Sequence, residues 1–157
     1  MPITWHIHSW ETISKKALYD ALTLRSLVFV VEQKCVYQDL DSKDENALHI
    51  LGYKQNVLVA YARVFLNTKP VSIGRVVIHP LFRRLGYGKH IMQKSIEQVP
   101  TKTSIHISAQ EHLKGLIISN MVPSIPDYQK YSDEVLAPKL DPEVLKEILI
   151  YEAKEDY

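Results

Sequence analysis

The residues best suited to chemistry lie between Arg83 and Lys89, in the run Arg-Arg-Leu-Gly-Tyr-Gly-Lys. This run follows a β-rich segment and precedes an amphipathic one, so its backbone N–H groups fall at the start of a helix and lack helical partners. Such donors, together with the positive end of the helix dipole, form an anion site suited to a pyrophosphate. Gly86 and Gly88 allow close approach of a phosphate to the backbone. Arg83, Arg84 and Lys89 add positive charge at the mouth.

Two other phosphate-binding motifs do not fit this loop. The P-loop requires Gly-Lys followed by Ser or Thr, whereas His90 follows Gly88 and Lys89. The dinucleotide fingerprint requires three glycines after the first strand, and this loop comes late in the chain with two.

Two further residues are candidates for proton transfer. Glu32 ends the apolar run Val-Val-Glu, where it could act as a base or bind an amine. It could equally be a partly buried carboxylate that is hydrogen-bonded to the backbone. His49 opens a predicted strand and has a near-neutral ordinary pKa, so it is either a catalytic base or a structural histidine.

Charged residues around these two define a candidate acceptor side. Asp39, Asp41 and Asp44 could form a rim that recognises a cation, or they could cap turns. Arg25 and Arg63 interrupt apolar faces, so each is expected to pair with one of these aspartates or with the preceding glutamate. The excess of carboxylates favours a cationic amine, of a small molecule or of a peptide, as the acceptor.

The elements that must position these residues can be predicted from hydrophobic periodicity. Alternating or continuous apolar runs predict strands at 3–7, 48–53, 57–66, 71–79 and 104–109. The run 57–66 is apolar almost throughout, which predicts a central strand covered on both faces.

Helical spacing predicts helices from Ser14, as the N-cap, to Phe29, and again at 91–99, 112–119 and 141–153. One hairpin interrupts the alternation of strands and helices. We therefore expect an α/β (α+β) fold with a central mixed twisted sheet and helices on both faces.

The motif Arg-x-x-Gly-x-Gly, following the strand Gly-Arg-Val-Val, resembles the coenzyme A loop of the GNAT N-acetyltransferase superfamily. A second block, Leu-Arg-Ser-Leu-Val-Phe-Val-Val-Glu-Gln-Lys-Cys-Val-Tyr-Gln-Asp-Leu-Asp from Leu24, is similar to the ElaA-like branch. Val-Ala-Tyr-Ala-Arg from Val59 and Ala-Gln-Glu-His-Leu from Ala109 are similar to it as well. The resemblance extends from about Trp5 to Leu113.

This resemblance implies an acyl-CoA N-acyltransferase fold that binds acetyl-CoA in a V-shaped opening between the fourth and fifth strands. The implied activity is transfer of acetyl from acetyl-CoA, as a cosubstrate, to a primary amine, with a strand N–H, that of Val77, binding the oxyanion. The implied cofactor contacts are Val76, Val77, Ile78, Arg83, Arg84, Leu85, Gly86, Tyr87, Gly88 and Lys89. Glu32 and His49 are then the catalytic candidates, and Arg25, Asp39, Asp41 and Arg63 the substrate-binding candidates.

The chain departs from the family after Ala-Gln-Glu-His-Leu. Ile117 stands about where the family has a tyrosine that donates a proton to the leaving thiolate, and Asn-Met-Val at 120–122 replaces Phe-Gly-Phe. Three prolines at positions 123, 126 and 138 disfavour a complete closing hairpin. Two alternatives therefore stay open: a CoA-binding protein with weak or lost catalysis, and a structural or partner-binding domain.

Composition limits the remaining classes. A length of 157 residues predicts a single domain over 1–157, with a divergent C-terminal part from about 114. A formal charge of +1 argues against a nucleic-acid partner, and one cysteine excludes a multi-cysteine zinc site, so no metal is expected. No apolar run of membrane-spanning length and no signal peptide is found. We expect a cytoplasmic protein without a membrane partner, and a possible homodimer.

Overall fold

The computed structural model describes residues 2–101, 103–109, 134–137 and 147–152. Their strands form a seven-stranded sheet in the order β1-β2-β3-β4-β5-β7-β6. Neighbours are antiparallel except for the parallel pairs β4–β5 and β5–β7, so the predicted mixed sheet is confirmed. The strands are β1 (Thr4–His8), β2 (Leu48–Lys54), β3 (Val57–Phe65), β4 (Val71–Ile78), β5 (Ser104–Ala109), β6 (Glu134–Ala137) and β7 (Glu147–Glu152).

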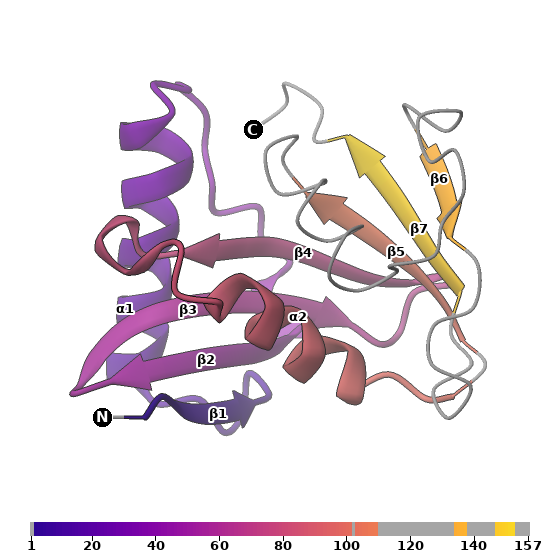
Figure 1. Cartoon of the computed structure of the whole chain (residues 1–157), viewed down its shortest axis with the longest axis horizontal. Helices are drawn as coiled ribbons and strands as arrows, with labels where there is room; N and C mark the ends of the chain where they lie inside the picture. Colours follow the sequence, from indigo (N-terminus) through magenta and orange to yellow (C-terminus); the bar gives the residue numbers. More distant parts are fainter. Residues whose placement is uncertain (1, 102, 110–133, 138–146, 153–157) are drawn as a thin grey trace.

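Helices cover both faces of the sheet, as predicted. Figure 1 shows α2 in front of the strands and α1 behind them. Ser14 caps α1, because its Oγ accepts the Ala17 N–H at 3.0 Å. Among the described residues, no helix has both the length and the apolar character needed to cross a membrane. The helices are α1 (Lys15–Arg25), α2 (Tyr87–Glu97), the π-helix η1 (Ser26–Glu32) and the 3₁₀ turns η2 (Asp44–Asn46) and η3 (Pro80–Phe82).

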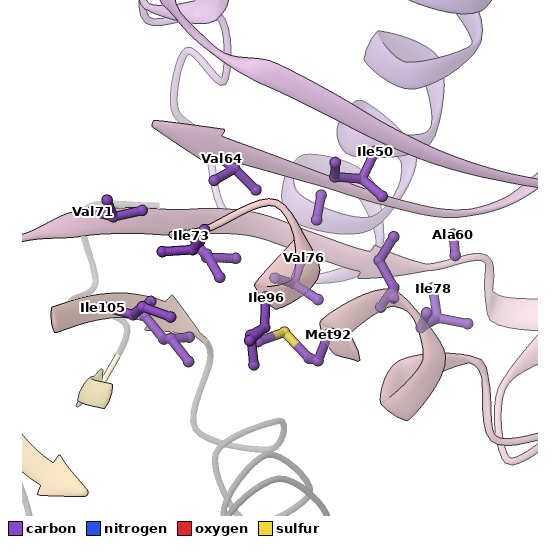
Figure 2. Close-up of a cluster of buried hydrophobic side chains, with 14 of the residues drawn as sticks. Ile50, Ala60, Val64, Val71, Ile73, Val76, Ile78, Met92, Ile96 and Ile105 are labelled. Carbon is purple, nitrogen blue, oxygen red and sulfur yellow. The ribbon is translucent and has the colours of Figure 1, made fainter. Parts of the chain in front are cut away.

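The face under α2 holds the larger core cluster. Met92 and Ile96 of α2 lie against Ile73 and Val76 of β4 and Ile105 of β5 (Figure 2). Each of these side chains is at most 5% exposed. Burial of one such aliphatic side chain stabilises the fold by about 1.5–3 kcal/mol. This packing fixes α2 across β4 and β5.

The face under α1 holds a second cluster, in which Leu24 and Phe29 pack with Tyr61 of β3 and Val77 of β4. The middle of β3 is buried on both faces, as its apolar run predicted. The helix predicted to end at Phe29 instead continues from α1 into η1, whose wider turns the periodicity did not reveal. These turns end at Glu32, whose side chain pairs with Arg83 beside the end of β4.

The C-terminal helix predicted over 141–153 is wrong for the residues that the structure describes there, because β7 occupies Glu147–Glu152. The segment Ile-Leu-Ile-Tyr fits a buried strand as well as a helix face, and parallel pairing with β5 decides between them. β6 pairs with β7 at four positions, so this part holds a short antiparallel pair. The predicted helix 112–119 and Ile117 lie outside the described residues.

Candidate active site

An opening lies between β4 and β5. Their pairing ends at Ile73 and Ile107, although β4 continues to Ile78 and β5 to Ala109, and Figure 1 shows the two arrows diverging. A register shift of β4 against β3 coincides with Arg75, whose φ of 51° is left-handed. This β-bulge bends β4 at the point where it leaves β5.

The backbone of Ile78 is directed toward this opening. The His79 N–H donates to the Val59 carbonyl at 2.8 Å, so these two residues form a hydrogen-bonded antiparallel pair. Hydrogen-bonded pairs alternate along such a ladder. Ile78 therefore turns its N–H away from β3, whereas Val77, opposite Tyr61, directs its N–H to β3. The expectation that the Val77 N–H binds an oxyanion is corrected accordingly.

The loop between η3 and α2 has the backbone geometry of an anion site. Gly86 precedes α2 with a φ of 87°, and no side chain caps the helix there. A Cβ built at Gly86 meets nothing within 4 Å, so the space over the loop is open. Arg84 is also left-handed, with a φ of 65°. The N–H groups of the first turn of α2 are thus presented to this space.

The side chain of Tyr87 in this loop contacts Lys54 and the core rather than the open space over Gly86. Its hydroxyl accepts a hydrogen bond from Lys54 Nζ at 3.2 Å, and its ring packs against the core cluster beneath α2. The side chain therefore anchors the start of α2 to the end of β2. Only its backbone belongs to the anion-binding loop.

Glu32 and Arg83 form an exposed ion pair beside the opening. Arg83 donates from Nη2 to Glu32 Oε1 at 2.6 Å and from Nη1 to Oε2 at 3.2 Å. Its Nε also donates to the Ile78 carbonyl at 3.4 Å. Both side chains are 37% exposed. The structure thus brings together a catalytic candidate, the first residue of the loop and the end of β4.

The other charged candidates form what we call the buried ion cluster. Arg25, which is fully buried, donates to Asp39 at 2.8 Å and to Asp44 at 2.6 Å. Arg63 donates to Asp44 at 3.0 Å and to both oxygens of Asp41. The expected pairing of Arg25 and Arg63 with aspartates is confirmed. The cluster consists of Arg25, Asp39, Asp41, Asp44, Arg63 and Arg75.

Sequence reasoning missed Arg75 as a member of this cluster. Its Nε donates to Asp39 Oδ1 at 2.8 Å, and its Nη2 lies 3.6 Å from Asp41 Oδ2. The signal was available, since Arg75 is a lone charge in the apolar run Ile-Gly-Arg-Val-Val-Ile. Three arginines neutralise the three aspartates, and Arg83 neutralises Glu32. The acidic excess expected on this side is therefore wrong.

Burial and ion pairing act in opposite directions on the aspartates of the cluster. Burial raises the pKa of Asp41, but the hydrogen bonds and charge of Arg63 outweigh it and hold the pKa below its ordinary value. Burial likewise raises the pKa of Asp44, and Arg25 and Arg63 bring it down again. Both carboxylates stay ionised at neutral pH.

His49 lies in the core, with no exposed surface. Its Nε2 lies 2.9 Å from the Asp44 carbonyl, which can only accept, so Nε2 carries the proton. Its Nδ1 then accepts from the Tyr61 hydroxyl at 2.7 Å. Burial lowers the pKa of His49 below 6.5. Of the two readings of this histidine, the geometry favours the structural one.

Comparisons with known proteins agree with this architecture. The sequence profile of the Acetyltransferase (GNAT) family matches residues 7–115. ElaA of Escherichia coli (strain K12) is 37% identical over 138 residues, covering 82% of this chain and 90% of that protein. The crystal structure of E. coli ElaA has a TM-score of 0.68 at 33% identity and covers 88% of this chain and 90% of that one.

An acyl-CoA N-acyltransferase from Pseudomonas aeruginosa has a TM-score of 0.64 at 29% identity, covering 87% of this chain and 89% of that one. A Clostridium acetobutylicum structure, described as a predicted acetyltransferase with acetyl-CoA, has a TM-score of 0.59 at 11% identity, covering 80% and 91%. The latter shares the fold alone. The chain therefore belongs to the acetyltransferase (GNAT) family, and within it to the ElaA-like branch.

Proposed function

We propose that the protein transfers an acetyl group from acetyl-CoA to a primary amine. The observation that carries this proposal is the adjacency of the β4–β5 opening to the uncapped start of α2 behind Gly86. The space over Gly86 is open, so the loop fits the pyrophosphate of CoA. Arg83, Arg84 and Lys89 supply the charge.

The acetyl end would lie along β4. The N–H of Ile78, turned away from β3, is the donor that we assign to the thioester carbonyl. The amine nitrogen attacks that carbonyl carbon, the C–S bond breaks, and CoA leaves as a thiolate. We expect water to protonate this thiolate, because Ile117 stands where the family has its tyrosine.

Glu32 is the base in this proposal, and it becomes available when Arg83 changes partner. The exposed ion pair is worth about 0–1 kcal/mol, whereas a guanidinium–phosphate contact is charge-assisted and bidentate. Binding of the pyrophosphate would therefore draw Arg83 from Glu32. The released carboxylate can take the proton of the incoming ammonium.

The remaining candidates are assigned supporting roles. His49 is a structural residue, because both ring nitrogens are hydrogen-bonded in the core. Arg25 and Asp39 are assigned a structural role, since each is at most 3% exposed and Asp39 ties Arg25 to Arg75 of β4. Asp41 and Arg63 lie nearer the surface of the same cluster. A single domain over 1–157, a cytoplasmic location and the absence of nucleic-acid and membrane partners stay predictions.

Two measurements test the function. Calorimetric titration with acetyl-CoA should give a saturable site, and thiol detection should show CoA release with at least one primary amine. Gly86→Asp should weaken acetyl-CoA binding by about 100-fold or more, because it places a carboxylate in the anion site. Gly86→Asn, which has the same size and tolerates positive φ but carries no charge, separates lost space from added charge and should weaken binding less than Gly86→Asp. Retained micromolar affinity in folded Gly86→Asp protein contradicts the loop assignment.

One alternative is favoured by a specific observation, the isoleucine at position 117. It is a CoA-binding member of the family that does not catalyse transfer. Saturable acetyl-CoA binding without thiol release across a broad amine panel is the result that would establish this alternative.

A further inference from the structure

A hollow of about 610 Å³ opens on the α1 face of the sheet. Residues of β4 form part of its wall, namely Ser72, Gly74 and Arg75. Asp41 and Lys43, from the segment before η2, form part of the opposite wall. Asn67, after β3, adds an exposed amide at the rim. Neither the anion-binding loop, Arg83 to Lys89, nor the rest of α2 contributes to the lining.

The hollow meets the β4–β5 opening from the α1 face of the sheet, whereas the anion-binding loop leads into α2 on the other face. Gly74 and Arg75 are the first residues of β4 after its last pair with β5, at Ile73. Gly74 lies opposite Arg63, and Ser72 opposite Phe65, both of which line the hollow. Their neighbours Ile73 and Val64 belong to the core cluster under α2. Because side chains alternate between the faces of a strand, Ser72 and Arg63 project to the α1 face.

The charge of the hollow differs from what its aspartate suggests. Both oxygens of Asp41 are occupied: Oδ1 accepts from Arg63 at 2.9 Å and from the Lys43 backbone N–H at 3.1 Å. Oδ2 accepts from Arg63 Nη2 and lies 3.6 Å from Arg75 Nη2. The charge of Asp41 is therefore already compensated by Arg63 and Arg75, which leaves it little net attraction for an ammonium.

Among the described side chains that line the hollow, the positive charge without a compensating partner belongs to Lys43. The three arginines and three aspartates of the buried ion cluster cancel. Lys43 is exposed at the rim of the hollow and has no ion-pair partner among the residues that the structure describes. The hydroxyl of Ser72, half-buried in the wall, is a further donor. An anionic group would be attracted here and a second ammonium repelled.

We infer that this hollow is the acceptor site and that it selects a primary amine carrying an anionic group, such as a carboxylate. The inference rests on the proposed function. Acetyl-CoA would approach the opening from the α2 side and the acceptor from the hollow, with its anionic group toward Lys43 and its amine directed past Gly74 along β4, toward the thioester. Charge complementarity then reverses the preference for a cationic acceptor that the carboxylates suggested in the sequence.

The test uses three amines of matched length and different charge: 5-aminopentanoate, 5-aminopentanamide and 1,5-diaminopentane. We expect kcat/KM to fall in that order, with the carboxylate about tenfold better than the diamine at low salt. Lys43→Glu should remove or reverse this order, while acetyl-CoA affinity stays unchanged. Lys15→Glu, an exposed lysine on α1 outside the hollow, is the matched control and should keep the order.

A preference for the diamine, or an unchanged order in Lys43→Glu, would overturn the inference. If acetyl-CoA binds but none of the three amines is acetylated, catalysis on these amines has failed and the hollow is tested separately. Titration with 5-acetamidopentanoate should then show binding that Lys43→Glu weakens and Lys15→Glu does not. Absence of that binding overturns the inference, and absence of acetyl-CoA binding overturns the proposed function itself.

Discussion

The exposed ion pair of Glu32 and Arg83 and the buried ion cluster use the same groups, guanidinium facing carboxylate, in different environments. Arg83 and Glu32 are each 37% exposed, whereas the side chain of Arg25 is fully buried and that of Asp39 is 2% exposed. Water can replace either partner of the exposed pair at small cost. It cannot do so in the cluster, where a lost partner leaves a charge in a poorly solvated site.

This difference separates the two roles that charged residues have around the cleft. The buried ion cluster ties the segment from Asp39 to Asp44 to α1, β3 and β4, so it fixes the position of this segment on the sheet. The exposed ion pair can exchange partners at small cost, which is what the proposed function requires of Arg83 and Glu32.

Replacement of Arg25 by alanine should have the largest effect on stability. Asp39 and Asp44 would each lose a buried partner, and we expect a loss of about 3–5 kcal/mol in the free energy of unfolding. Urea denaturation measures it. Lys16→Ala, which removes an exposed i,i+4 pair with Asp20, is the control and should change stability by less than about 0.5 kcal/mol. A loss of stability below about 1 kcal/mol for Arg25→Ala would contradict the distinction between the exposed ion pair and the buried ion cluster.

Glu32→Gln should lower turnover by about 100-fold, since general base catalysis contributes at least that much. It should also tighten acetyl-CoA binding by about twofold to fivefold, because Arg83 no longer has a competing carboxylate. Calorimetry and steady-state kinetics measure both. Glu97→Gln, which removes an exposed pair with Lys94 at the far end of α2, should change neither. Weaker acetyl-CoA binding would instead mean that Glu32 positions Arg83.

Stability should fall in two steps as the pH is lowered. The pKa of His49 is below 6.5 in the fold, so the unfolded chain takes up its proton first and stability falls as the pH drops below about 6.5. Asp41 and Asp44 also have lowered pKa values, so the stability they contribute is present above pH 3.8 and is lost below it. Urea denaturation between pH 7.5 and 3 measures both steps. His49→Gln should flatten the first step and leave the second.

The smallest expected effect is that of salt, which should weaken the exposed ion pair of Glu32 and Arg83 and leave the buried ion cluster nearly unchanged. At 1 M NaCl the Debye length is about 3 Å, so exposed charges are largely screened. The affinity gain of Glu32→Gln over wild type should then disappear, while the stability loss of Arg25→Ala persists. A gain that is equal in low and high salt would show that it does not arise from competition between charges.

The glycine turn before α2, most of the strands and the cap of α1 could be predicted from the sequence, because each depends on local signals. The positive φ of Gly86 and the cap of Ser14 each depend only on the residue type and on the helix that follows directly in the chain. The strands that reach the core show apolar runs of their own. The helix predicted to include 147–152 was wrong because the apolar residues of this segment suit a helix and a strand alike. Pairing with the neighbouring β5 decides which one forms.

Which aspartate each arginine binds, and which backbone N–H of β4 faces the opening, were decided by the tertiary structure. The contacts of Asp39 span 14 residues to Arg25 and 36 to Arg75, and nothing local to any of these residues encodes them. Whether Ile78 or Val77 directs its N–H to the opening depends on the register of β4 against β3. A charged side chain in the sequence is only a possible ion; the fold determines whether it is neutralised in the core, as Arg25 is, or left exchangeable at the surface, as Arg83 is.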